Sequence, residues 1–218
     1  MRLVVFDVDG TLVDSQNHIT HAMGFAFDQV GLTPLPKAQV LSIVGLSLPV
    51  AVAQLAPEVD ADTQARIVAA YKDSFMRARL DSAAPLYDGA MACLDRLADR
   101  DDLMLAVATG KSRRGLDAMI KAHGLQGRFL SLQTADGHPS KPHPSMLQAA
   151  LAETGTQADR AVMIGDTSFD MLMAGAAGLA GFGVSWGYHP VEALHGAGAV
   201  RVLDDFATLT QAIEEWAA

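Results

Sequence analysis

The sequence is poor in the residues that cross-link chains covalently or bind soft metals. Cys93 is the only cysteine among 218 residues, so the chain cannot form an internal disulfide or a zinc-binding thiolate cluster. A reducing compartment is the usual place for such a protein. We therefore expect a cytoplasmic location.

Long apolar runs and positive charge are also scarce. No stretch approaches the roughly 18 apolar residues that a membrane-spanning helix needs, and the first apolar run, 3–6, is too short for a signal peptide. Lys and Arg number 16 against 25 Asp and Glu, a formal net charge of -9. This balance argues against nucleic acid or an anionic membrane as the main partner. An acidic protein that handles phosphate would need local positive charge, from a metal ion and a few lysines.

The remaining composition is that of an ordinary globular protein. Half of the residues are hydrophobic and 19% are charged, and no repeat or low-complexity tract is evident. The length allows one domain with a smaller insertion.

Short apolar runs alternate with segments of helical spacing through most of the chain. The predicted strands are 3–6, 103–108, 161–164, 181–184 and 200–203, with a weaker one near 129–133, and the helices between them are 90–100, 114–123, 144–154, 169–177 and 206–216. This alternation predicts an α/β fold with a parallel sheet covered on both faces. The region 16–84 breaks the pattern, with helical stretches at 19–30, 49–55 and 62–79 and no convincing strand. We interpret it as a helical insertion after the first strand.

Polar residues follow the ends of several predicted strands. In open parallel sheets, ligands bind beyond the carboxyl ends of the strands, so these residues should converge on one edge. They are Asp7 and Asp9 after the first strand, Thr109, Gly110 and Lys111 after the second, and Asp166 and Asp170 after a later one, with Lys141 in the loop 140–144.

The aspartates predict a magnesium site, a nucleophile and an acid–base residue. Clustered carboxylates raise one another's pKa unless a cation intervenes, and Mg²⁺ prefers oxygen ligands. The carboxylates of Asp7 and Asp166 and the backbone carbonyl of Asp9 are suitable ligands. Asp7 could also attack phosphorus directly, while Asp9 protonates the leaving oxygen and later activates water. A turn with a helix cap is the structural alternative for this segment.

The other polar groups suit phosphate but are individually less specific. Thr109 and Gly110 could bind phosphate through a hydroxyl and backbone N–H groups, although a capped strand-to-helix turn explains them equally well. A nucleotide-binding P-loop is excluded because Leu105 stands where that motif needs glycine. Lys141 would neutralise charge on the phosphoryl oxygens. Asp170 would hydrogen-bond waters or Lys141, whereas Asp166 alone fits a helix cap as well as a metal.

Four segments in order resemble the haloacid dehalogenase superfamily, specifically its phosphoglycolate phosphatase-like branch. They are Asp7-Val8-Asp9-Gly10-Thr11-Leu12-Val13-Asp14-Ser15, Thr109-Gly110-Lys111, Ser140-Lys141-Pro142, and Gly165-Asp166 through Asp170. The resemblance implies a Rossmann-like, doubly wound core at 1–15 and 85–218 and a helical cap domain at 16–84.

The resemblance also implies roles for single residues. Asp7 would be the nucleophile and Asp9 the acid–base, while Thr109 and Lys141 would bind phosphate. Asp166 would hold Mg²⁺ with Asp170 in support. The cap loop around Gly45 would face the substrate. One departure is Gly110, where relatives often carry asparagine, so a side-chain contact to the substrate or hinge could be lost.

These features predict a Mg²⁺-dependent phosphatase for a small phosphorylated metabolite such as 2-phosphoglycolate. Asp9 argues against halide displacement, and the missing Arg-x-x-Lys pattern near Gly45 makes sugar phosphomutase activity less favoured. A receiver-like signalling module, a phosphate-sensing module, and a nucleotide or pyrophosphate phosphatase stay open as alternatives. The sequence does not choose between a monomer and a homodimer, nor does it assign roles to His18, His21, Lys111 and Trp186.

Overall fold

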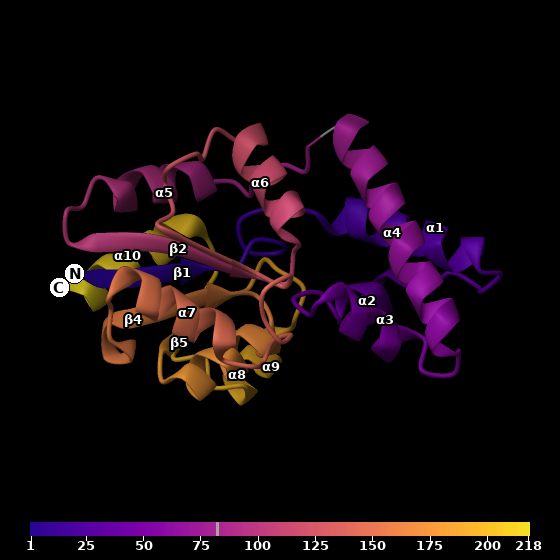
Figure 1. Ribbon diagram of the computed structural model, residues 1–218. Helices are drawn as coiled ribbons and strands as arrows, with labels where there is room; N and C mark the ends of the chain where they lie inside the picture. The colour runs from indigo at the N-terminus through magenta and orange to yellow at the C-terminus, as the bar shows by residue number, and fades with distance from the viewer. Residues whose placement is uncertain (82) are drawn as a thin grey trace.

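The computed structural model describes residues 1–81 and 83–218 and contains a six-stranded, fully parallel sheet (Figure 1). The strand order is β3-β2-β1-β4-β5-β6, which is the doubly wound order of Rossmann-like folds. The strands are β1 (Arg2–Phe6), β2 (Leu103–Thr109), β3 (Ser131–Thr134), β4 (Ala161–Gly165), β5 (Ala180–Val184) and β6 (Arg201–Leu203). The predicted fold class is confirmed.

Helices cover both faces of the sheet, so the central strands are apolar on both sides. One face packs against α5 (Ala90–Ala98), α6 (Arg113–Ala122) and α10 (Phe206–Ala217), and the other against α7 (Ser145–Thr154) and α8 (Ser168–Ala177). Val4 and Phe6 of β1 face the first layer, while Leu3 and Val5 face the second. This alternation explains why β1 reads as an uninterrupted hydrophobic run.

Four further helices lie between β1 and β2 in the chain: α1 (Gln16–Gln29), α2 (Lys37–Leu41), α3 (Leu48–Leu55) and α4 (Ala61–Asp81). We call them the helical insertion. They enclose a hydrophobic cluster of their own around Met23, Phe27, Val52 and Ile67. Figure 1 shows them beyond the carboxyl ends of the strands, beside the sheet edge at which the polar residues were expected to meet. No helix among the described residues is long and apolar enough to cross a lipid bilayer.

The two chain segments that connect the helical insertion to the sheet run side by side. The backbone N–H of Asp14 donates to the carbonyl of Pro85 over 2.9 Å, and that of Tyr87 donates to the carbonyl of Leu12 over 3.0 Å. Val13 and Leu86 form an antiparallel bridge between these bonds. The insertion therefore leaves and rejoins the core through one pair of hydrogen-bonded linkers.

The sequence missed the shortest elements. α2 and α9 (Val191–Gly196) are too short to show helical periodicity, and each begins directly after a proline, Pro36 and Pro190. The weak strand expected near 129–133 starts later, at Ser131, because Phe129 packs into the core and Leu130 is 66% exposed. The short 3-10 helix Ala158–Arg160 was also not predicted.

The packing of α5 on the sheet gives a stability prediction. Leu94 is fully buried against the sheet, so Leu94→Ala should lower the free energy of unfolding by about 2–5 kcal/mol through lost contacts and a residual cavity. Leu130→Ala, at a largely exposed leucine, should change it by less than about 0.5 kcal/mol. Urea unfolding of both variants measures the difference, and equal losses would contradict the packing described here.

Candidate active site

Asp7 lies directly beyond the end of β1. Its backbone N–H donates to the carbonyl of Ile164 in β4 over 2.9 Å, which fixes it where β1 and β4 end together. The side chain is 1% exposed, and neither carboxylate oxygen has a hydrogen-bond partner among the described residues. Nζ of Lys141 lies 3.0 Å from Oδ1, within ion-pair distance but without hydrogen-bond geometry. Both oxygens therefore keep lone pairs free for a ligand.

The loop after β1 brings the chain close to Asp166. Gly10 adopts a positive φ of 85° and donates its N–H to the carbonyl of Val13 over 3.0 Å. A Cβ atom at Gly10 would collide with the carboxylate of Asp166. Only glycine combines this backbone conformation with this close approach.

Three carboxylates meet at this point, those of Asp7, Asp166 and Asp170. One oxygen from each lies within 4.8 Å of the other two, and all three side chains are buried. Burial raises the pKa of Asp7 to about 6, and the nearby charges of Asp170 and Asp9 add to this rise while Lys141 opposes it. Burial also raises the pKa of Asp166 well above its ordinary value, with further contributions from Asp7 and Asp170.

Asp166 follows β4 and is held from two sides. Its Oδ1 accepts a hydrogen bond from the Thr11 hydroxyl over 2.9 Å, and its Oδ2 accepts from the backbone N–H of Tyr188 over 2.9 Å. Each oxygen keeps a free lone pair directed elsewhere. The cap of α8 is Thr167 and not Asp166, so the helix-cap explanation of Asp166 is wrong.

Asp170 accepts three hydrogen bonds from protein groups. Its Oδ1 accepts from Nζ of Lys141 over 2.6 Å, and its Oδ2 accepts from the N–H and the hydroxyl of Thr167 over 3.1 and 2.7 Å. The latter bonds complete a capping box at the start of α8. Asp170 therefore orients Lys141, which is one of the two contacts expected for it.

Lys141 is the buried cation of the cluster. Its ammonium is almost fully shielded from solvent and pairs with Asp7 and Asp170. Burial alone would lower the pKa of this group, but the two carboxylates outweigh burial and raise the pKa above its ordinary value. The raised pKa favours the charged form of the lysine at neutral pH.

The carboxylate of Asp9 points away from this cluster. Ser15 donates its hydroxyl to Oδ1 over 2.6 Å, and Nζ of Lys111 lies 2.8 Å from Oδ1 and 2.7 Å from Oδ2. The same ammonium lies 5.0 Å from the centre of the Phe75 ring in α4. Lys111 thus links the expected acid–base residue to the helical insertion, a role that its place two residues after Thr109 did not reveal.

A cavity of about 540 Å³ separates the sheet edge from the helical insertion. Asp7, Asp9, Thr109 and Gly110 line it from the core, and Gly45 lines it from the insertion. The predicted residues at the ends of β1 and β2 therefore share one chamber. Lys141, Asp166 and Asp170 lie behind Asp7.

Gly110 also marks the close approach of the insertion to the core. A Cβ atom there would lie 2.5 Å from the carbonyl oxygen of Gly45 and 2.6 Å from that of Leu46. The expectation of a lost side-chain contact is therefore incomplete, because the insertion loop occupies the space that a side chain would need. The loop is further held by Ser47, whose N–H donates to the Ser140 hydroxyl over 2.8 Å.

Sequence reasoning did not foresee how distant groups secure the site. The backbone of Tyr188 reaches Asp166, and its hydroxyl lies 3.2 Å from that of Ser15. Trp186 donates its indole N–H to the carbonyl of Thr11 over 3.0 Å and packs against Phe206. The contacts of Tyr188 with Ser15 and of Trp186 with Thr11 join residues more than 170 positions apart, and no local sequence pattern predicts them.

Comparisons with known proteins identify the family of this chain. The family described as haloacid dehalogenase-like hydrolase matches residues 4–184. A protein named probable phosphatase IndB from Dickeya dadantii is 35% identical over 96% of this chain and 92% of its own length. A phosphoglycolate phosphatase from Rhodospirillum rubrum is 36% identical over 95% of this chain and 89% of its own length. The chain belongs to the haloacid dehalogenase-like hydrolase family.

Solved structures give the same result. A hydrolase from Pseudomonas syringae superposes with a TM-score of 0.88 at 27% identity, covering 99% of both chains. A predicted phosphatase from Clostridium acetobutylicum superposes with the same TM-score at 26% identity, covering 98% of both. The predicted family and the predicted enzyme class, a phosphoric monoester hydrolase, are confirmed by these matches.

The raised pKa of Asp7 makes a prediction about stability without metal. Its folded pKa of about 6 lies above the ordinary 3.8, so burying the charged form costs stability above pH 6, by at most about 3 kcal/mol, and this cost vanishes below about pH 4. Asp7→Asn should therefore be more stable than the unaltered protein at pH 8 in EDTA, and the gain should disappear as the pH falls. Urea unfolding at pH 4, 6 and 8 measures it.

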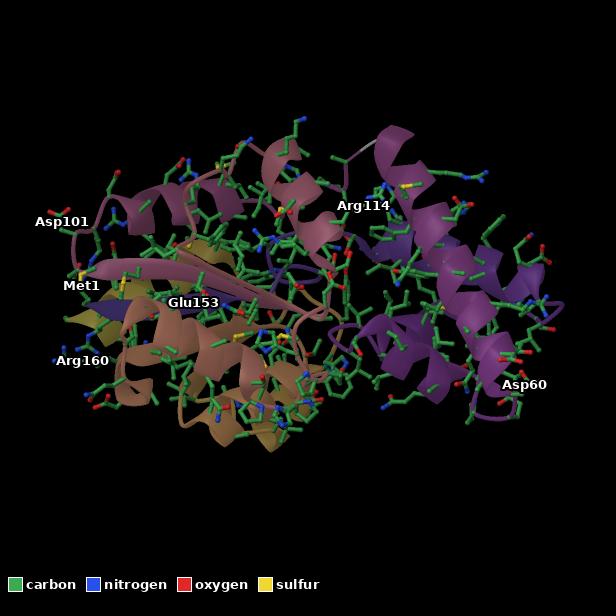
Figure 2. All side chains as sticks on the ribbon, in the orientation of Figure 1. Met1, Asp60, Asp101, Arg114, Glu153 and Arg160 are labelled. Carbon is green, nitrogen blue, oxygen red and sulfur yellow. The ribbon has the colours of Figure 1, made fainter. Side chains whose placement is uncertain are left out.

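The control is Asp101→Asn, at an exposed aspartate on the far end of the core (Figure 2). This variant should show no gain at pH 8. A loss of stability in Asp7→Asn that is equal at all three pH values would contradict the electrostatic account of the cluster.

Proposed function

We propose that this protein is a Mg²⁺-dependent phosphatase that transfers the phosphoryl group of a small organic phosphate monoester to Asp7 and then to water. The helical insertion, 16–84, would act as a cap over the core formed by 1–15 and 85–218. One observation carries the proposal: the buried carboxylate of Asp7 has no hydrogen-bond partner among the described residues and lines a cavity beside the ammonium of Lys141.

The donor set fits Mg²⁺. Asp7 offers two oxygens without hydrogen bonds, Asp166 keeps a free lone pair on each oxygen, and the expected third ligand is the backbone carbonyl of Asp9. Oxygen-only sets with one or two carboxylates are typical of Mg²⁺. When bound, the ion would offset the negative charge that the carboxylates and the phosphate bring together.

The first chemical step uses Asp7 and Asp9. A carboxylate oxygen of Asp7 attacks phosphorus, the bond between phosphorus and the ester oxygen breaks, and Asp9 donates a proton to the departing alkoxide. Ser15 and Lys111 hold the Asp9 carboxylate at the cavity wall, where it can reach the leaving group. The alcohol then leaves as a neutral molecule.

The second step restores the enzyme. Asp9, now a carboxylate, accepts a proton from a water molecule as the water oxygen attacks phosphorus. The bond between phosphorus and Asp7 breaks, and inorganic phosphate leaves. In both steps Lys141 and the hydroxyl and N–H groups at Thr109 and Gly110 would stabilise the charge on the phosphoryl oxygens.

The alternatives receive less support. A putative β-phosphoglucomutase from Bacteroides vulgatus superposes with a TM-score of 0.84, but at 21% identity this likeness concerns the fold alone. A receiver-like or phosphate-sensing module would not need Asp9 as an acid or a chamber closed by an insertion. The names of several relatives make 2-phosphoglycolate the first natural ester to test. A single buried cysteine fits the cytoplasm as the proposed location.

Activity provides the direct test. Turnover of p-nitrophenyl phosphate should require Mg²⁺ and stop in EDTA, because the carboxylate cluster then lacks its cation. Asp7→Asn should abolish turnover because it removes the nucleophile, and Asp9→Asn should lower kcat for a poorly leaving alkyl phosphate by about 10²–10⁴-fold. Steady-state release of phosphate measures both.

Asp101→Asn serves as the matched control and should keep full activity. Mg²⁺ should also raise the melting temperature of the unaltered protein but not that of Asp7→Asn, since only the former binds the ion in the folded state. Full turnover by Asp7→Asn, or stoichiometric phosphorylation without turnover, would refute the proposed phosphatase mechanism.

A further inference from the structure

The wall of the cavity opposite the catalytic aspartates is apolar. The helical insertion contributes Val44, Leu46, Leu48, Tyr71, Phe75 and Met76 to it. Tyr71 and Phe75 stack with their ring centres 5.6 Å apart and their planes at 18°, which gives this wall a continuous aromatic surface. Lys72 of the insertion and Arg114 of α6 also line the cavity, so this apolar wall borders on charged side chains.

The floor of the same cavity has the opposite character. Asp7, Asp9 and Thr109 lie there, and Lys111 is already paired with Asp9. A molecule that spans the cavity would therefore meet charged and hydrogen-bonding groups at one end and hydrocarbon at the other. The phosphate end is fixed by the chemistry proposed above, so the apolar wall must face the alcohol part of the ester.

The size of the cavity excludes a very small alcohol as its full occupant. Its volume of about 540 Å³ lies within the roughly 300–1,000 Å³ of pockets that enclose drug-sized ligands. A two-carbon acid such as the alcohol part of 2-phosphoglycolate would leave most of the apolar wall facing water.

We propose that the preferred substrates are phosphate monoesters of alcohols with a bulky apolar body, an aromatic ring or a comparable alkyl chain, packed against Leu48, Tyr71 and Phe75. This inference rests on the proposed phosphatase function and names the substrate class for the same site. The free energy gained by removing the apolar body from water would distinguish these esters from short ones.

A series of primary alkyl phosphates tests the proposal, because their leaving groups differ little in chemistry. Ethyl phosphate, 2-phenylethyl phosphate and 2-phosphoglycolate are compared by kcat/KM with saturating Mg²⁺. We expect 2-phenylethyl phosphate to exceed each of the other two by at least about tenfold. Equal values, or a preference for 2-phosphoglycolate, would overturn the proposal.

Two variants on α3 locate the effect in the cavity. Leu48 lines the cavity, whereas Val50, two residues later, is 38% exposed and lies outside the lining. Leu48→Asn should lower the ratio of kcat/KM for 2-phenylethyl over ethyl phosphate by about tenfold, and Val50→Asn should leave the ratio unchanged. The substrate series in the unaltered protein decides the question even if Leu48→Asn does not fold.

Failure of the proposed function gives a different result from failure of this inference. If no ester is hydrolysed, the phosphatase mechanism fails, and the cavity is then tested by calorimetric titration with the same compounds. Binding of 2-phenylethyl phosphate at least about tenfold tighter than ethyl phosphate would support the apolar substrate class. Equal binding would overturn it.

Discussion

The structure depends on a buried group of charges that the protein alone leaves unbalanced. Asp7, Asp166 and Asp170 face a single ammonium, that of Lys141, and all four side chains are shielded from water. Three carboxylates and one lysine leave an excess of negative charge in a medium of low dielectric constant. Protons or a cation must compensate this negative charge, and the pKa values of Asp7 and Asp166 are raised for this reason. A site built in this way is prepared for an ion before any ion binds.

Topology explains why these residues meet although the chain separates them widely. β1 and β4 are neighbours at the centre of the sheet, and the chain turns in opposite directions from this point. Both strands end at the crevice where such sheets bind ligands, so Asp7 and Asp166 become neighbours without any local motif joining them. The loop before α7 then brings Lys141 between Asp7 and Asp170, and the Thr167–Asp170 capping box fixes the partner that orients the lysine.

Much of this arrangement could be predicted because it follows from periodicity and strand ends. Three sequence patterns each predict one feature of the structure. They are the apolar run of β1, the acidic residues directly after it and the helical spacing of 62–79. No sequence signal predicts three other contacts: Asp9 with Lys111, Tyr188 with Asp166, and Gly110 with Gly45. They are set by how the insertion and the loop after β5 dock on the sheet, and docking depends on three-dimensional packing that local spacing does not encode. The helices α2 and α9 were not predicted for a simpler reason: five or six residues are too few to show helical periodicity.

The paired linkers at Val13 and Leu86 have a consequence for how such a chain can diversify. Because the outgoing and returning segments are hydrogen-bonded to each other, the chain passes between the sheet and the helical insertion at one place. Residues of the insertion can then be exchanged, lengthened or rearranged while the strand register and the charges behind Asp7 stay untouched. Evolution could thus change the residues of the insertion that line the cavity, and with them the preferred alcohol, without changing the catalytic residues of the core.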